Sequence, residues 1–191
     1  MGAWIKMISD EEATEDLKEV FEKVRTPSGS IDNVMRVHSL RPHTMEGHVA
    51  LYKSVLHNPK NALDLWFLEV VASYTSILNK CDYSLTHHFM NVRRLLENEK
   101  LSDTIFKALK TQKPEKKFEG KHLALLIYAE KLTLNISKMR ETDIQLLREA
   151  GCDDGEILEV NQVCAYFNYS NRLLNGLGVS TAGDVVGYYK K

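Results

Sequence analysis

The chain has 191 residues with 43% apolar content, which is enough for one substantial hydrophobic core and favours a single domain over residues 1–191. Its 25 basic and 26 acidic residues give a formal net charge of −1, so it lacks the positive charge that attracts nucleic acid or an anionic membrane surface. No apolar run approaches the ~18 residues of a membrane span, and no apolar signal segment is expected near the first residue.

The three cysteines indicate the compartment. Cys81, Cys152 and Cys164 are odd in number and far apart, unlike the paired cysteines of small secreted domains. We therefore expect a cytoplasmic protein with free thiols, in which Cys152 is exposed after a helix-ending glycine and Cys164 lies in the core.

Helical spacing of apolar residues runs through the chain, and no segment shows the alternation of a β-strand. All four prolines fall between the apolar segments, and Pro42 fits the first turn of a helix. Ser9 with Glu12, Ser102 and Thr142 are predicted to begin helices as caps. The predicted helices cover, in chain order, residues 9–25, 31–38, 42–57, 62–78, 81–96, 102–109, 123–134, 142–150 and 153–175. The fold class is therefore predicted to be all-α.

Two segments organise this helical chain. The helix over 62–78 is apolar nearly all round, which predicts burial among neighbours, and Glu69 within it predicts a buried carboxylate that needs a partner. The charged segment 112–120 contains Pro114 and reads as an exposed loop. It separates a half of about 9–111 from a second half of about 121–186.

A cysteine, a hydroxyl and an imidazole come together at the start of the fifth predicted helix. Cys81 and Ser84 lie at or just before its first turn, where unpaired N–H groups and the helix dipole stabilise a thiolate. His88 follows Ser84 by four residues, which places both on one helix face. We predict a site that combines Cys81, Ser84 and His88 with the carboxylate of Glu69.

The order of these residues resembles a known family. Glu69, Cys81 twelve residues later, Ser84 and His88 are similar to the Glu, Cys-x-x-Cys and His signature of the alkyl hydroperoxidase D (AhpD)-like proteins of the carboxymuconolactone decarboxylase superfamily. Residues 33–42, 81–88 and 165–178 resemble its peroxidase-related branch. The likeness spans about residues 5–180 and implies an AhpD-like fold with two helical halves in one domain.

The resemblance implies a thiol peroxidase, of peroxiredoxin type, that reduces hydrogen peroxide or small organic hydroperoxides with an external thiol as reductant. Glu69 and His88 are then the proton relay and Cys81 the redox thiol, with no metal or flavin cofactor and with assembly into a homo-oligomer. The second cysteine of the motif is Ser84 here. A hydroxyl can neither form nor resolve a sulfenic acid, so a peroxidase cycle has to run through Cys81 and a thiol from elsewhere.

Two other functions stay open. The decarboxylase side of the superfamily suggests non-redox acid–base chemistry on a small carboxylated ring, carried by His88 and Glu69 and independent of Cys81. A retired scaffold that kept the fold and lost the chemistry is the third possibility. A zinc site of Glu69, Cys81 and His88 is the least favoured alternative.

The remaining candidates are assigned to structure. His87 is expected to be a partly exposed surface histidine. His43 and His48 are five residues apart and do not share a helix face, which argues against a metal pair. Tyr166, with the neighbouring Phe167 and Tyr169, is expected to pack and could line a pocket for an organic peroxide.

Overall fold

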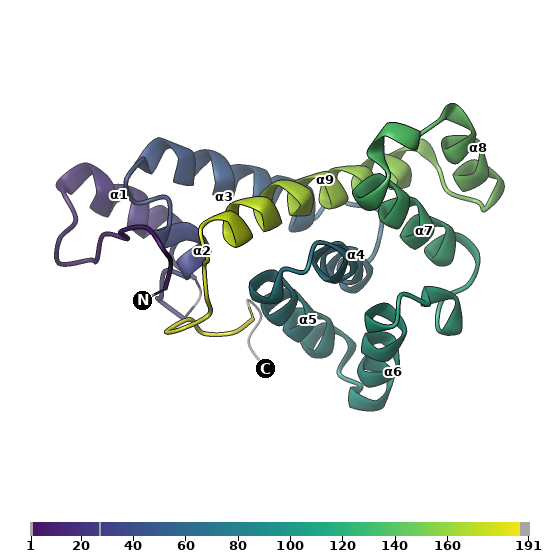
Figure 1. Ribbon diagram of the computed structural model, residues 1–191, viewed down its shortest axis with the longest axis horizontal. Coiled ribbons are helices and arrows are strands. Elements are labelled where there is room, and N and C mark those ends of the chain that lie inside the picture. The colour runs from purple at the N-terminus through teal and green to yellow at the C-terminus, as the bar shows by residue number, and fades with distance from the viewer. Residues whose placement is uncertain (1, 27, 188–191) are drawn as a thin grey trace.

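The computed structural model describes residues 2–26 and 28–187, and within these ranges it is all-helical, as predicted (Figure 1). Two single turns of 3-10 helix, Pro114–Lys116 and Ile136–Lys138, flank α7. The α-helices are α1 (Glu15–Val24), α2 (Asn33–Arg36), α3 (Pro42–Leu56), α4 (Leu65–Leu78), α5 (Asp82–Leu96), α6 (Glu99–Lys110), α7 (Gly120–Leu134), α8 (Glu141–Glu149) and α9 (Asp154–Gly176). No described helix is long and apolar enough to cross a membrane.

Helix α4 is the centre of the molecule. Of its 14 residues 12 are buried, among them Glu69, because α5, α7 and α9 pack around it. Figure 1 shows α4 enclosed between α9 on one side and α5 and α6 on the other. The prediction that this segment is buried on every face is confirmed, and the Glu69 carboxylate lies in the main hydrophobic core.

Helix α9 joins the two ends of the molecule. It runs for 23 residues along the long axis, from α7 and α8 at one end to α2 at the other (Figure 1). Its start is fixed by Asp153, whose side chain accepts the N–H of Glu156 at 2.8 Å while the Glu156 carboxylate accepts the N–H of Asp153. Helices from both ends of the molecule, α3 as well as α7 and α8, therefore pack on one continuous helix.

The predicted caps at Ser9 and Ser102 are wrong. The N–H of Ser9 does donate to the Glu12 carboxylate and the N–H of Glu12 to the Ser9 hydroxyl, each at 3.3 Å, but these bonds close an isolated turn and α1 begins only at Glu15. Asn98 caps α6 in place of Ser102, because its side chain accepts the N–H of Leu101 at 2.9 Å. Ser102 is instead buried within α6, where its hydroxyl donates to the Asn98 carbonyl at 2.8 Å.

The predicted cap at Thr142 is also wrong. Helix α8 begins at Glu141, and the Asp143 carboxylate accepts the N–H of Arg140 at 2.8 Å. The predicted helix end at Gly151 is confirmed, since this glycine has a φ of +90°. The division into a motif half and a second half remains a prediction.

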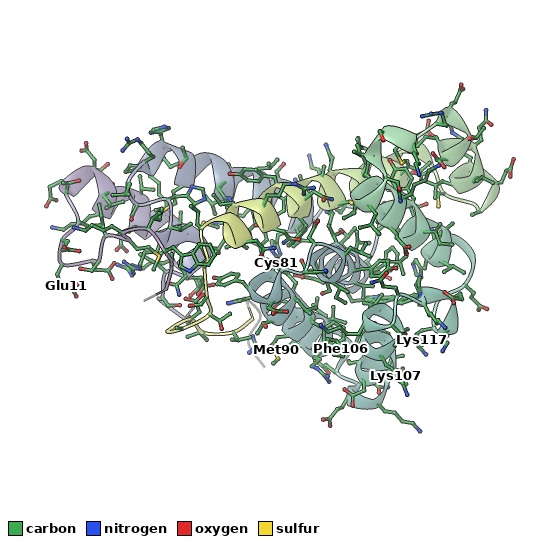
Figure 2. The ribbon with its side chains drawn as sticks, viewed as in Figure 1. Glu11, Cys81, Met90, Phe106, Lys107 and Lys117 are labelled. Carbon is green, nitrogen blue, oxygen red and sulfur yellow. The ribbon has the colours of Figure 1, made fainter. Side chains whose placement is uncertain are left out.

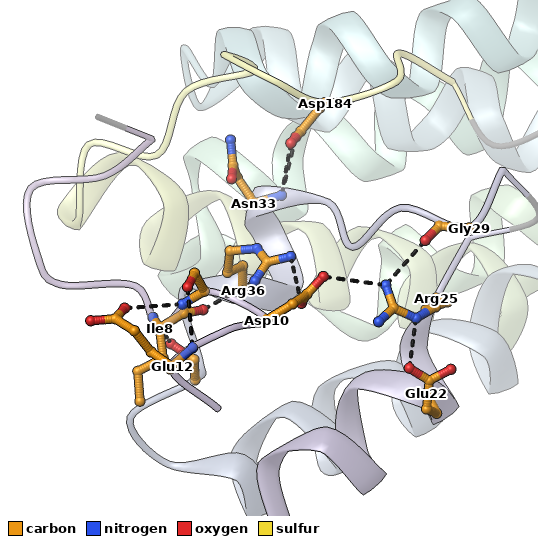
Figure 3. Close-up of polar contacts among 11 residues, drawn as sticks. Ile8, Asp10, Glu12, Glu22, Arg25, Gly29, Asn33, Arg36 and Asp184 are labelled. Atoms are coloured by element: carbon orange, nitrogen blue, oxygen red, sulfur yellow. Dashed lines mark hydrogen bonds and ion pairs between the residues drawn. The ribbon is translucent and has the colours of Figure 1, made fainter. Parts of the chain in front are cut away.

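The N-terminal segment is held on the other helices by paired charges. Asp10 lies between Arg36, 3.2 Å away, and Arg25, 3.6 Å away (Figure 3). Arg25 also donates to the Gly29 carbonyl at 3.1 Å and to Glu22 at 2.8 Å. These contacts fix the loop after α1, which forms part of the site described below.

The central position of α4 gives the first prediction. Leu68 is 0% exposed in the main core, so Leu68→Ala should lower the free energy of unfolding by about 2–5 kcal/mol through lost burial and a residual cavity. Leu146→Ala, at a position 60% exposed on α8, is the matched control and should change it by less than about 0.5 kcal/mol. Urea unfolding measures both, and equal losses would contradict α4 as the centre of the core.

Candidate active site

A tight connection between α4 and α5 positions the predicted residues. Lys80 adopts the left-handed conformation with a φ of +54°, which reverses the chain directly after α4. The N–H of Cys81 then donates to the Ser76 carbonyl at 2.9 Å and fixes Cys81 as the residue that precedes α5. Helices α4 and α5 lie side by side as a result, so a side chain of α4 can meet the face of α5 that carries Ser84 and His88.

Glu69 and His88 form a buried pair. The Glu69 carboxylate is 0% exposed, and its Oε2 lies 2.7 Å from Nδ1 of His88. Its Oε1 accepts a hydrogen bond of 3.0 Å from the amide of Asn91. Because the carboxylate accepts a hydrogen bond from Nδ1–H, Nε2 of a neutral His88 carries the lone pair that can act as a base. Asn91 is absent from the residues predicted from sequence, although its spacing of three from His88 on one helix is the signal for it.

A cavity of about 70 Å³ opens beside this pair, between the N-terminal helices, α5 and α9. His88, Ser84 and Tyr166 are on its wall, and Arg25 and Lys53 contribute cationic side chains. Several water molecules or one small organic group fit such a volume, because a single water needs only ~10–15 Å³ measured in this way. The other lining residues are Val24, Thr26, Asp32, Val34, Met35, Val49, Tyr52, Tyr83, His87, Asn91, Ser170 and Leu174.

Ser84 faces this cavity. It is the third residue of α5 and is 2% exposed overall. Within residues 2–26 and 28–187, no side-chain hydrogen bond of Ser84 is found, whereas Ser76 and Ser102 donate to the carbonyl one turn earlier. The Ser84 hydroxyl is thus not hydrogen-bonded to any described residue, His88 included, and it lies on the same wall as His88.

Cys81 is separated from the cavity. It is 1% exposed, is not among the described residues that line the cavity, and packs in a small apolar cluster. Figure 2 shows it at the start of α5. The apolar residues of this cluster are Ala3, Val37, Cys81, Tyr83, Leu174 and Val179. Burial raises the pKa of the Cys81 thiol, the nearby charge of Asp82 adds to that, and the N–H groups of Ser84 and Tyr83 oppose it.

The C-terminal segment closes over this cluster. The Asp184 carboxylate accepts the Tyr83 hydroxyl at 2.5 Å and the N–H of Asn33 at 3.0 Å. The N–H of Ser180 donates to the Gly2 carbonyl at 2.8 Å. Residues from both ends of the described chain therefore shield the thiol from solvent.

Two expectations about exposure are wrong. His87 is only 7% exposed, because it stacks on Tyr83 with 4.8 Å between ring centroids and lies 3.5 Å from Asp184. Cys152 is buried as well, and Cys164 lies in the core as expected. The chain that covers His87 comes from the C-terminal segment, which no local pattern around residue 87 can reveal.

A second buried pair supports the opposite wall. Nε2 of His48 lies 2.8 Å from the hydroxyl of Tyr166, so the expectation that Tyr166 packs and lines a pocket is met in the structure. Burial, reinforced by the neighbouring His38, lowers the pKa of His48 to about 3. His57 behaves in the same way, with its pKa lowered to about 4 by burial and by His88 and Lys53. His48 and His57 are thus neutral groups near neutral pH.

No group of three or more histidine, cysteine, aspartate or glutamate residues in the described part of the chain is arranged to hold a metal ion. The alternative zinc site of Glu69, Cys81 and His88 is therefore not found as a group of ligands in the structure. Both Glu69 oxygens are instead occupied by hydrogen bonds to His88 and Asn91.

Comparison with solved structures identifies the fold. No protein-family model matches the sequence, and no curated protein matches it. A peroxidase-related protein from Ralstonia eutropha JMP134, described as an alkylhydroperoxidase AhpD core, is 20% identical with a TM-score of 0.81 over 95% of this chain and 93% of that one. A peroxidase-related protein from Silicibacter sp. TM1040 is 21% identical with a TM-score of 0.80 over 94% and 91%.

The same fold occurs in a protein with a different activity. The debrominase Bmp8 is 14% identical, with a TM-score of 0.73 over 94% of this chain and 91% of that one. It has also been solved in complex with 2,3,4-tribromopyrrole, as a cysteine-to-alanine variant. The class that these matches define is the AhpD-like helical fold, and this chain has that fold, as predicted.

The buried histidines give a prediction about acid stability. The unfolded chain protonates His48 near pH 6.5, whereas the folded protein resists this until about pH 3, so the stability contributed by neutral His48 is complete above pH 6.5 and is lost as the pH falls. The loss is at most roughly 1.4 kcal/mol per pH unit.

His48→Gln should therefore make the decline of unfolding free energy between pH 6 and pH 4 shallower, as measured by urea unfolding at each pH. His43→Gln, at an exposed position on the same helix, is the control and should leave the slope unchanged. A slope that is the same in His48→Gln and in the unmodified protein would contradict this assignment.

Proposed function

We propose that this protein is an enzyme that transfers protons on a small carboxylated organic molecule bound in the cavity, with His88 as the acid–base group. One observation carries the proposal: His88 is on the cavity wall, and its Nδ1 is held at 2.7 Å by the fully buried Glu69 carboxylate. A histidine arranged in this way accepts a proton at Nε2, and the carboxylate stabilises the imidazolium that forms.

The charges around the cavity favour an anionic substrate. Lys53 forms no ion pair within the described residues, and Arg25 adds a second cationic side chain, although Asp10 and Glu22 partly neutralise it. Asp32 is the acidic side chain of the cavity wall, and burial raises its pKa to about 6, which lowers its negative charge near that pH. A substrate whose carboxylate binds near Lys53 would have the rest of its small molecule directed toward His88. Abstraction of a proton beside a carbonyl group, as in an isomerisation or a decarboxylation, is the reaction class that needs only these residues.

The test is hydrogen–deuterium exchange. Small carboxylated carbonyl compounds and lactones, incubated with the protein in D₂O, should lose the proton beside the carbonyl, as followed by NMR. His88→Gln and Glu69→Gln should each lower the exchange rate by about 10²-fold or more, because the base is removed or loses its orientation. Cys81→Ala should retain exchange.

His43→Gln, an exposed histidine outside the cavity, is the matched control for this experiment. Exchange that is unchanged in His88→Gln would contradict the proposal. Loss of exchange in Cys81→Ala, with a native unfolding curve, would contradict it as well and would favour thiol chemistry.

The second candidate is the thiol peroxidase. Two features support it: N–H groups of Tyr83 and Ser84 favour the Cys81 thiolate, and solved structures with this fold are described as peroxidase-related. The Cys81 thiolate would attack a peroxide oxygen, break the O–O bond, release water or an alcohol and become a sulfenic acid. Two molecules of an external thiol would then restore it, releasing a disulfide and water. Burial of Cys81 and its position off the cavity place this candidate second.

Ser84→Cys tests whether the scaffold still supports peroxide chemistry, because it puts a thiol on the cavity wall one helical turn from His88. If the scaffold still supports peroxide chemistry, this variant should consume an organic hydroperoxide at least about tenfold faster than the unmodified protein, whose Cys81 is buried. Mass spectrometry with a sulfenic-acid trap maps the oxidised residue. Rapid trapping at Cys81 in the unmodified protein, faster than at Cys152 and Cys164, would instead make the peroxidase the primary function. The expected homo-oligomer remains a prediction.

A further inference from the structure

Ser84, at the position of the second cysteine of the motif, carries a hydroxyl that can itself act as a nucleophile. Ser84 and His88 are one helical turn apart and line the same cavity, and the Glu69 carboxylate binds Nδ1 of His88. These residues match the three groups of a serine hydrolase triad: the hydroxyl is the nucleophile, the imidazole is its base, and the carboxylate orients the imidazole. We propose that Ser84 is a nucleophile for acyl transfer and that the protein hydrolyses small esters.

Three features of Ser84 support this role. Its hydroxyl forms no hydrogen bond with the described residues, so no competing partner has to be displaced before it approaches His88. Its position in the first turn of the 15-residue α5 lies in the positive field at the start of the helix, although the N–H groups of Tyr83 and Ser84 are themselves directed at the Cys81 sulfur. Its surroundings are largely buried, which strengthens the electrostatic interactions because little water competes.

The orienting carboxylate is unusually well fixed. Asn91 donates to Glu69 Oε1 at 3.0 Å, which leaves Oε2 for His88 and prevents the carboxylate from turning. The edge of the His88 ring packs against Phe167, with 4.5 Å between centroids. These contacts hold the imidazole with Nδ1 toward Glu69 and leave Nε2 as the nitrogen available on the cavity side.

The reaction balances with water as the only co-substrate. Ser84 Oγ bonds to the ester carbonyl carbon while His88 takes the hydroxyl proton, and the C–O bond to the alcohol then breaks as His88 returns that proton to the leaving oxygen. Water, deprotonated by His88, then attacks the acyl-serine ester, and the C–O bond to Ser84 Oγ breaks as His88 returns the proton to Oγ, which releases the carboxylic acid. The small volume of the cavity, about 70 Å³, favours a short acyl group such as acetyl.

The proposal relies on the same His88–Glu69 pair as the proton-transfer function, but a covalent probe tests it separately. The protein is treated with a small alkyl fluorophosphonate, which phosphonylates activated serines, and the modified residue is mapped by mass spectrometry. Hydrolysis of p-nitrophenyl acetate is measured in parallel. We expect a single modification at Ser84 and p-nitrophenol release that depends on it.

Ser84→Ala should abolish both signals, and His88→Gln should slow both by about 10²-fold or more. Ser102→Ala, which removes a buried helical hydroxyl away from the cavity, is the matched control and should change neither. Ser84→Cys retains a nucleophile at the position and should still release p-nitrophenol with acetylation of the introduced thiol. This variant keeps the test informative if the alanine variant fails to fold.

Absence of modification at Ser84, or modification that is equally fast in His88→Gln, would overturn the proposal. If deuterium exchange still depends on His88 in that case, the proton-transfer function stands while the esterase is excluded. Modification of Ser84 that depends on His88, in a protein without deuterium exchange, would leave the esterase standing and exclude the proton-transfer function.

Discussion

A carboxylate in the middle of the most buried helix constrains how the rest of this protein packs. Glu69 is 0% exposed and lies among the apolar side chains of α4, where an unpaired charge would cost several kcal/mol. Both of its oxygens are paired, and both partners, His88 and Asn91, come from α5. The need to satisfy Glu69 thus fixes the register of α5 against α4, and the same bonds set the orientation of His88 at the cavity.

The beginning of α5 places two neighbouring groups in different environments. Cys81 precedes the helix and has an extended backbone, with φ and ψ of −102° and 91°, so its side chain does not follow the helix face of Ser84 and His88. It enters the apolar cluster that the terminal segments cover, and burial raises its pKa. Ser84, three residues later, faces the cavity. The identity of residue 84 therefore has more influence on the chemistry of the cavity than the retained cysteine does.

The fold does not determine the reaction. Solved structures that share it are described as peroxidase-related proteins and as a debrominase, at identities of 14% to 21%. What this chain does depends on which nucleophile and which base reach the cavity. The cavity wall of this chain carries a serine hydroxyl and an imidazole supported by a carboxylate, groups whose chemistry is suited to proton and acyl transfer more than to peroxide reduction.

The sequence by itself determined the helical class, the burial of the segment around Glu69 and the presence of Ser84 and His88 on one helix face. Each of these follows from local periodicity, since residues four apart share a face and an apolar run without a polar side must be enclosed. Helix starts were less predictable, as at Ser102, because several polar residues compete to cap the same turn and small differences in geometry decide among them.

Only the tertiary structure decided which groups are accessible. The pairing of Glu69 with His88 joins two helices, and the cavity wall combines the N-terminal helices with α9. A segment about 100 residues further along the chain shields His87 and, together with the N-terminal segment, Cys81, as in the contact between Asp184 and Tyr83 at 2.5 Å. Such contacts depend on how distant segments pack. The sequence pattern around a residue therefore does not predict which distant segment will cover that residue.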